Sequence, residues 1–179
     1  MKLGEIITPL LKLLEDARAA EEHLNEHNTQ FARRAYIRSI FANIEGTIWL
    51  FKQTFLKIVS EKKMRMLTPA EYALLSDKTY DLTEKGEPRE QQKFLRLPEN
   101  VQFTFRIFNR LFSSKLDVGV GSQNWANFKA AIETRNRLAH PKNANDIDVS
   151  DKEIEAAKET CDWFNELMHD CIKIMSPTK

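Results

Sequence analysis

Glycine and proline are scarce in this sequence, with 5 and 6 occurrences among 179 residues. The residues that replace them, above all Leu, Ala, Glu and Lys, are good helix formers, so the composition argues against a turn-rich all-β fold and favours helices. A chain of this length lies within the usual range of one domain and buries about 70% of the surface that its unfolded form exposes. We therefore predict an all-α fold with residues 1–179 forming a single helical domain.

Cysteine is also scarce, since Cys161 and Cys171 are the only two. They lie on one expected helix, where a rise of about 1.5 Å per residue separates them by roughly 15 Å. This separation is too large for a disulfide bond. We expect two buried free thiols, which is typical of a cytoplasmic protein in a reducing compartment.

Neither an excess of one charge nor a long apolar run is present. The 27 basic and 26 acidic residues leave a net charge of +1, so only a local patch can attract a polyanion. Charged residues interrupt the apolar N-terminal segment, which argues against a signal peptide. The most apolar stretch elsewhere, from Thr47 to Phe51, ends at Lys52, and we expect no contact with a membrane.

Apolar residues recur at helical spacing along most of the chain. The pattern predicts a bundle of about five to six helices, with a polar, irregular or hairpin-forming excursion around residues 76–100. Within this excursion, residues 80–82 and 94–97 are the expected strands. The expected helices cover residues 3–27, 30–62, a short segment after Thr68, the segment from Val101 to Phe112, residues 122–140, and a last helix from Ser150.

Capping residues indicate where several of these helices begin. Thr68 is followed by Pro69 and Glu71, and Ser150 is followed three residues later by an acid, the pattern of a capping box. Ser122 is the expected cap of the helix 122–140. That helix should stop at His140, because the following proline disfavours helical backbone at the residue before it.

The helix 122–140 carries the strongest chemical signal. Its apolar face is expected to contain Trp125, Phe128, Ile132 and Ala139. Arg135 falls in the middle of this face, and burying a guanidinium is costly unless it is paired. Asn136 and His140 lie along one edge of the same face.

His140 stands at the carboxyl end of this helix, where the helix dipole favours its imidazolium form. Arg135 and His140 together suit acid–base chemistry on a phosphate ester. The alternative is a structural ion pair between Arg135 and a glutamate, beside an ordinary helix-end histidine.

Glu45 and Arg38 are supporting candidates on the long second helix. Glu45 lies at the edge of its apolar stripe, beside Phe41 and Ile48, and a carboxylate there needs a partner. A structural ion pair is the first interpretation. Arg38 lies two turns earlier, in a cluster with Arg33 and Arg34.

Two further groups of polar residues have ordinary explanations. The arginine cluster, like the pair Arg106 and Arg110, is interpreted first as a solvated face and alternatively as an RNA contact. His23 and His27 lie one helical turn apart, which permits metal binding, but no third ligand is near in sequence. We therefore expect no metal and no cofactor.

The segment from Arg135 to His140, Arg-Asn-Arg-Leu-Ala-His, resembles the motif of the HEPN superfamily (higher eukaryotes and prokaryotes nucleotide-binding domain). That motif is an Arg and a His separated by four to six residues, with a polar residue commonly after the Arg. The helix from Trp125, the loop and the capped helix from Ser150 resemble stand-alone bacterial members. The likeness is close over the last third of the chain and looser around Glu45.

The resemblance implies a helical bundle that dimerises so that the two motifs face each other across a cleft. Many members are metal-independent endoribonucleases that act as toxins of toxin–antitoxin pairs or as phage-defence effectors. An RNA substrate, a second copy of the chain and an antitoxin protein are the implied partners. Some members are inactive, so the alternative is a non-catalytic helical dimer that binds a partner protein or a nucleotide.

The resemblance also implies roles for the motif residues. His140 would deprotonate the ribose 2′-hydroxyl or protonate the leaving 5′-oxygen, Arg135 would stabilise charge on the phosphate, and Asn136 would hold Arg135 or the substrate. Members that are paired with a nucleotidyltransferase antitoxin often have a modifiable tyrosine two residues after the histidine. Lys142 occupies that position here, which argues against this mode of regulation.

Overall fold

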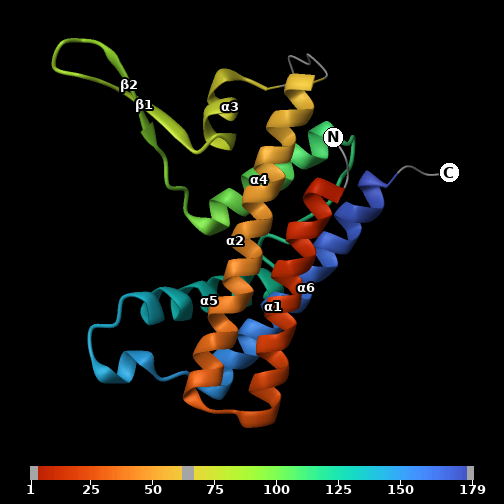
Figure 1. Cartoon of the computed structure of the whole chain (residues 1–179), viewed down its shortest axis with the longest axis vertical. Helices are drawn as coiled ribbons and strands as arrows, with labels where there is room; N and C mark the ends of the chain where they lie inside the picture. The colour runs from red at the N-terminus through yellow and green to blue at the C-terminus, as the bar shows by residue number, and fades with distance from the viewer. Residues whose placement is uncertain (1–3, 62–66, 177–179) are drawn as a thin grey trace. The chain divides into compact units, whose positions relative to one another are not determined.

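The computed structural model of the chain describes residues 4–61 and 67–176, and its elements are mostly helical (Figure 1). Within these residues the prediction of an all-α fold with a small hairpin excursion is confirmed. The elements in chain order are α1 (Gly4–His27), α2 (Gln30–Glu61), α3 (Pro69–Leu75), β1 (Lys78–Leu82), β2 (Pro88–Gln92), α4 (Leu97–Leu111), α5 (Gln123–Ala139), the short 3₁₀ helix η1 (Ala144–Ile147) and α6 (Asp151–Met175). The outermost expected helix residues, Leu3 and Lys62, lie outside the described residues.

The predicted helix caps are confirmed. The Thr68 hydroxyl accepts a hydrogen bond from the backbone N–H of Glu71, whose carboxylate accepts one from the backbone N–H of Thr68. Ser150 and Glu153 form the same reciprocal pair at α6, and the Ser122 hydroxyl caps α5. These bonds satisfy backbone donors that a helix start leaves without partners, which is why the sequence marks these boundaries clearly.

The hairpin is present, but its second strand is not where the sequence analysis placed it. β2 pairs antiparallel with β1, with Tyr80 opposite Glu90, so the strand ends before the expected segment 94–97 begins. Leu97 instead opens α4, with a proline in the first turn of the helix. Alternating apolar residues before that proline imitate a strand, although they form the approach to a helix.

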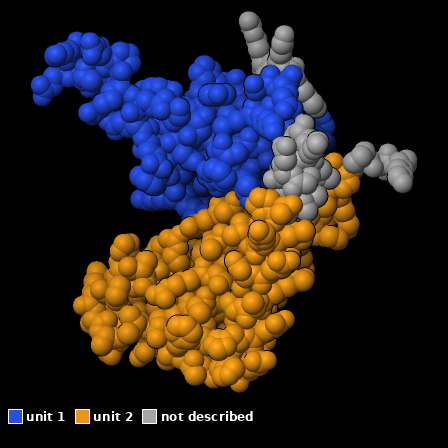
Figure 2. Space-filling model, in the orientation of Figure 1, with its two compact units in different colours: residues 1–6, 48–115 blue, residues 7–47, 116–179 orange. Residues whose placement is uncertain are grey.

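The described residues separate into two compact units (Figure 2). Unit 1 comprises residues 1–6 and 48–115, and unit 2 comprises residues 7–47 and 116–179. The long helix α2 contributes its C-terminal part to unit 1 and its N-terminal part to unit 2. The expectation that residues 1–179 form a single domain stays a prediction.

The core of unit 1 is built from phenylalanine side chains of α2 and α4. The ring of Phe108 lies 6.2 Å from both Phe51 and Phe55, measured between centroids, and 4.8 Å from Phe112. Lys52, whose side chain is 1% exposed, lies in this buried part of α2 and forms an ion pair with Asp77. The pair joins α2 to the residue that precedes β1.

Unit 2 consists of α1 from residue 7 onward, the first part of α2, α5, η1 and α6. α5 packs against α6, where the rings of Trp125 and Phe128 lie 6.0 and 5.1 Å from Trp163. α1 approaches α2 closely at Gly46, because a Cβ atom there would lie 2.7 Å from Leu13. A side chain at this position would require the side chain of Leu13 to move.

The two cysteines are both buried and free, as the sequence predicted. Burial raises the pKa of the Cys171 thiol to about 12, so it stays protonated and unreactive at neutral pH. None of the described helices combines the length and apolar character that crossing a membrane requires.

Candidate functional site

Several side chains in the last turns of α5 are exposed or partly exposed. The buried side chains of this helix are Trp125, Phe128, Ala131, Thr134 and Leu138. The predicted apolar face is therefore wrong at its C-terminal end, where Ala139 is exposed and the side chain of Arg135 is 30% exposed. Leu138 in the last turn is still buried, but the side chain of Arg135 is partly exposed, so its guanidinium is reachable from solvent.

Arg135 is held by three groups of unit 2. Its guanidinium forms an ion pair with Glu45 of α2 and donates a 2.8 Å hydrogen bond to the Oδ1 atom of Asn136. It also lies over the ring of Phe41, 5.5 Å from the centroid, in a cation–π arrangement. Partial burial lowers the pKa of Arg135, but a guanidinium remains protonated at neutral pH.

A pocket of about 340 Å³ lies between the N-terminal part of α2 and the end of α5 within unit 2. Its charged members are Arg38, Glu45 and Arg135, so two guanidinium groups face one carboxylate. An oxyanion such as a phosphate complements this excess of positive charge. The lining residues are Arg38, Phe41, Ala42, Glu45, Arg135, Leu138 and Ala139.

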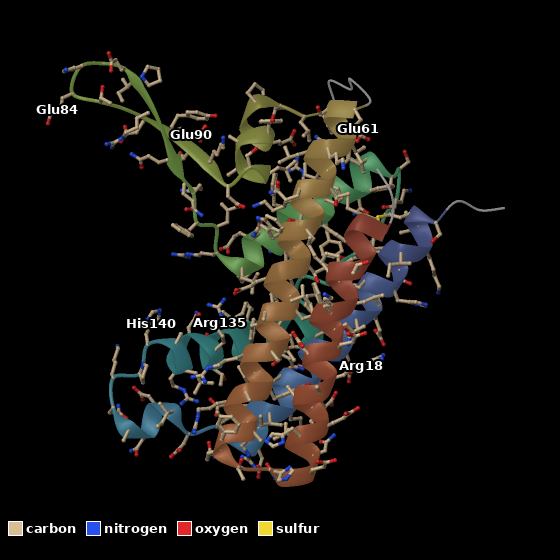
Figure 3. The ribbon with its side chains drawn as sticks, in the orientation of Figure 1. Arg18, Glu61, Glu84, Glu90, Arg135 and His140 are labelled. Atoms are coloured by element: carbon tan, nitrogen blue, oxygen red, sulfur yellow. The ribbon has the colours of Figure 1, made fainter. Side chains whose placement is uncertain are left out.

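His140 is the C-cap residue of α5, five residues after Arg135, and it is not among the residues that line the pocket. Figure 3 shows the two residues at this end of the helix. The backbone N–H of His140 donates a 3.0 Å hydrogen bond to the carbonyl oxygen of Asn136, which fixes the backbone that carries the ring. The side chain is exposed, and within the described residues no hydrogen bond or ion pair of the imidazole is present. Both ring nitrogens are therefore available to exchange protons with a ligand.

Arg137 has a role that the sequence analysis missed. Its guanidinium donates hydrogen bonds to the carbonyl oxygens of Asp146 and Asp148 and forms an ion pair with Glu153. Burial raises the pKa of Glu153, but hydrogen bonds from Ser150 and Arg137 outweigh this effect and lower it overall. Arg137 thus connects the end of α5 to the following loop and to the start of α6. Its partner Glu153 lies 16 residues later in the chain, and helical periodicity does not predict a contact over that distance.

Two members of the expected basic cluster on α2 hold the same loop. Arg33 donates a 2.8 Å hydrogen bond to the carbonyl oxygen of Val149 and pairs with Asp151, and its side chain is only 13% exposed. Arg34 donates to the carbonyl oxygen of Ile147. The interpretation of this cluster as a solvated face is therefore wrong for Arg33, whereas Arg38 is exposed and lines the pocket.

The other polar residues considered from sequence are not among those that line this pocket. Arg110 of unit 1 forms an ion pair with Glu71, while Arg106 is exposed. The rings of His23 and His27 stack on each other with centroids 4.5 Å apart. Across residues 4–61 and 67–176, no group of three or more His, Cys, Asp or Glu side chains is arranged to hold a metal ion.

Comparison with known proteins yields no relative: no protein-family model, curated protein or solved structure matches the chain. The resemblance of residues 135–140 to the HEPN motif therefore stays a prediction, based on the motif residues and their position at a helix end.

Proposed function

We propose that the protein is a metal-independent endoribonuclease whose active site is formed by Arg135, Asn136 and His140. One observation carries the proposal: an accessible guanidinium in an open, positively charged pocket lies on the same helix end as a histidine with a free imidazole. Catalysed cleavage of a phosphate ester requires these two functions, a group that binds the anion and a group that transfers a proton. RNA supplies its own nucleophile, so no bound metal is required.

In the proposed reaction the ribose 2′-oxygen attacks the adjacent phosphorus as a base removes its proton. The bond from phosphorus to the 5′-oxygen breaks, and that oxygen takes a proton from an acid. The products are a 2′,3′-cyclic phosphate and a 5′-hydroxyl end. Arg135 stabilises the charge on the phosphate oxygens, Asn136 and Glu45 position Arg135, and Arg38 adds a second positive charge at the pocket.

The reaction uses both a base and an acid, whereas the motif supplies one histidine per chain. We therefore propose that two copies of the chain form a symmetric dimer in which both motifs face one RNA strand. The role that follows is a cytoplasmic toxin or phage-defence effector, with an antitoxin protein as a partner of the toxin form.

The direct test is cleavage of single-stranded RNA by the purified protein in excess EDTA. We expect cleavage to continue and the products to carry 2′,3′-cyclic phosphate ends. Arg135→Ala and His140→Ala should remove most of the activity while the circular dichroism spectrum and the mass in light scattering stay those of the wild type.

Matched controls lie on exposed surfaces of other helices. His169→Ala on α6 and Arg18→Ala on α1 remove the same residue types away from the pocket, and both should retain full cleavage. Undiminished cleavage by folded Arg135 and His140 variants would end the assignment of the site. Activity that EDTA abolishes and a divalent ion restores would end the metal-free mechanism.

A non-catalytic dimer that binds a partner protein or a nucleotide is the second candidate. It is favoured by the contacts that Arg135 already makes with Glu45, Asn136 and Phe41, as a structural arginine would. Induced expression in cells separates the two candidates, because a ribonuclease should arrest growth and a binding module should not.

A further inference from the structure

Unit 1 contains a pocket of its own, of about 330 Å³, that belongs to neither the motif nor its helix. It lies between the C-terminal part of α2 and the hairpin β1–β2. Two of its lining residues come from α2, two precede β1, and four belong to the hairpin. They are Trp49, Gln53, Ser76, Asp77, Lys78, Glu90, Gln91 and Gln92.

The charged groups of this pocket cancel in pairs. The Lys78 ammonium lies 2.9 Å from the carboxylate of Glu90, and Asp77 pairs with the buried Lys52. The pocket therefore has no net charge to attract a phosphate group. Its ligand must be recognised by shape, stacking and neutral hydrogen bonds.

The remaining lining groups are an indole, three amides and the hydroxyl of Ser76, which donates a hydrogen bond to the carbonyl oxygen of Tyr72. Trp49 is 54% exposed, although its neighbour Ile48 and Phe51 of the same helix are each 1% exposed. Gln53, Gln91 and Gln92 each carry an amide with two N–H donors and one carbonyl acceptor. In the part of the chain that the structure describes, no hydrogen bond engages these three amide groups. Gln92 shares a hairpin face with Lys78 and Glu90, whereas Gln91, opposite Thr79, lies on the other face, so the amides of Gln53 and Gln92 are the ones available to a ligand.

A second aromatic ring lies on the hairpin. Side chains alternate between the two faces of a strand, so Tyr80 shares a face with Lys78 and with its cross-strand partner Glu90. Both of those residues line the pocket. Tyr80 is 60% exposed, and it flanks the pocket on the hairpin side while Trp49 lines it from α2.

We propose that this pocket binds an unpaired nucleobase. The base stacks on the indole of Trp49, with Tyr80 as a flanking ring, and the amides of Gln53 and Gln92 bond its donor and acceptor edge. A nucleobase is planar, neutral and rich in both hydrogen-bonding functions, which is the chemistry that this lining complements. The proposal requires no catalytic step at His140, so it is independent of the proposed nuclease activity.

Tryptophan fluorescence tests the proposal on the whole chain. Trp125 and Trp163 are 5% and 6% exposed, so contact quenching by an added ligand reports Trp49. The probe is single-stranded DNA, which lacks the 2′-hydroxyl and survives the proposed cleavage reaction. An abasic strand of equal length supplies the same phosphates without bases, and free nucleosides separate base binding from strand binding.

We expect the base-bearing strand to quench Trp49 and the abasic strand to leave it unchanged. Quenching by the nucleosides as well assigns the site to the isolated base, and quenching by the strand alone assigns it to a base within a strand. Trp49→Ala should weaken strand binding, measured by fluorescence anisotropy, by roughly tenfold or more, whereas Trp49→Phe should retain most of it. Phe31→Ala removes an exposed ring from unit 2 and should have no effect.

Substitution of the glutamine amides should change the preference among bases and not the stacking itself. Gln53→Leu and Gln92→Leu should reduce the difference in affinity among strands of the four bases without removing the quenching. Equal quenching by the abasic strand, or wild-type affinity of a folded Trp49→Ala variant, would overturn the proposal. If the protein cleaves RNA but Trp49 is not quenched by the base-bearing strand, only the nucleobase site is disproved. If Trp49 is quenched but RNA is not cleaved, only the nuclease assignment is disproved.

Discussion

Unit 1 and unit 2 differ in the kind of side chain that they expose. Among the described residues, the large apolar side chains exposed on unit 1 are mainly aromatic: Trp49, Tyr72, Tyr80 and Phe94, with Leu82. Those of unit 2 are aliphatic except for Phe31. Aromatic rings offer flat faces for stacking, while unit 2 offers an arginine-lined pocket and, on the same helix end, a free histidine, so the two units offer different chemistry to a ligand.

The units also differ in what their ion pairs do. In the ion pair of unit 1, the side chain of Lys52 is buried, with 1% of its surface exposed, whereas the side chain of Asp77 is 27% exposed. In unit 2 the pair between Arg135 and Glu45 is 30% and 43% exposed. A buried pair is costly to break, whereas an exposed one contributes little to stability and can exchange partners. We therefore expect the first pair to contribute to stability and the second to be able to exchange its partner for a ligand.

The largest expected effect separates catalysis in unit 2 from binding in unit 1. His140→Ala should lower kcat for RNA cleavage by about 100-fold or more, because a proton-transfer group is lost. Trp49→Ala should raise KM and leave kcat nearly unchanged, because stacking holds the substrate without touching the reacting phosphate. Steady-state kinetics on a short RNA measure both, and a matching fall in kcat for both variants would remove the distinction.

Next in size is the cost of breaking the buried pair in unit 1. Asp77→Asn should reduce the free energy of unfolding by about 3 kcal/mol, because it leaves the Lys52 ammonium buried without a counter-charge. Asp77 has a φ of 53°, and asparagine tolerates that conformation, so backbone strain stays the same. Urea unfolding measures the loss. The double variant with Lys52→Met should regain much of it, and failure to do so would indicate that the charge is not the cause.

A smaller effect is expected from the two arginines of the motif region in unit 2. Arg137→Ala should cost about 1–2 kcal/mol, because it breaks the ion pair with Glu153 and two hydrogen bonds to loop carbonyls. Arg135→Ala should cost less than about 1 kcal/mol, since its pair with Glu45 is partly exposed. Thermal unfolding ranks the two variants against Arg18→Ala. The reverse order would make Arg135 the structural residue.

The smallest expected effect is a pH dependence in unit 1. A hydrogen bond from Arg110 lowers the pKa of Glu71 from 4.5 to about 2, with a further contribution from the backbone N–H of Thr68 and against the effect of partial burial. The resulting stability is complete above the unfolded value of 4.5 and is lost as the pH falls towards 2. Glu71→Gln should flatten the unfolding free energy over this range, and an unchanged slope would exclude Glu71 as its source.

Local signals in the sequence predicted the helices well. Thr68, Ser122 and Ser150 mark helix starts because a cap needs only residues within one turn, and Pro141 marks the end of α5 for the same reason. The second strand of the hairpin was misplaced because its polar residues carry no apolar alternation. Its position depends on pairing with β1, which is not a local property.

The candidate site was predictable in its residues but less so in its surroundings. The spacing of Arg135, Asn136 and His140 places them on one helix end, and the position of Glu45 at the edge of an apolar stripe indicated that it needs a partner. The sequence does not reveal that Arg33 and Arg137 bind a loop while Arg38 is exposed, because arginines at the surfaces of helices look alike in sequence. Long-range partners such as Val149 and Glu153 decide the difference.

The loop between α5 and α6 has a consequence for how its sequence can vary. Gln30, Arg33, Arg34 and Arg137, all outside the loop, hold it mainly through its backbone carbonyl oxygens. Backbone groups are the same whatever the side chain, so the conformation of the loop is determined largely by residues outside it. Inside it, Asn143 and Asp146 form the caps of η1. Positions such as Lys142 and Asn145 should therefore accept many substitutions, and the surface beside His140 can be redesigned without redesigning the fold.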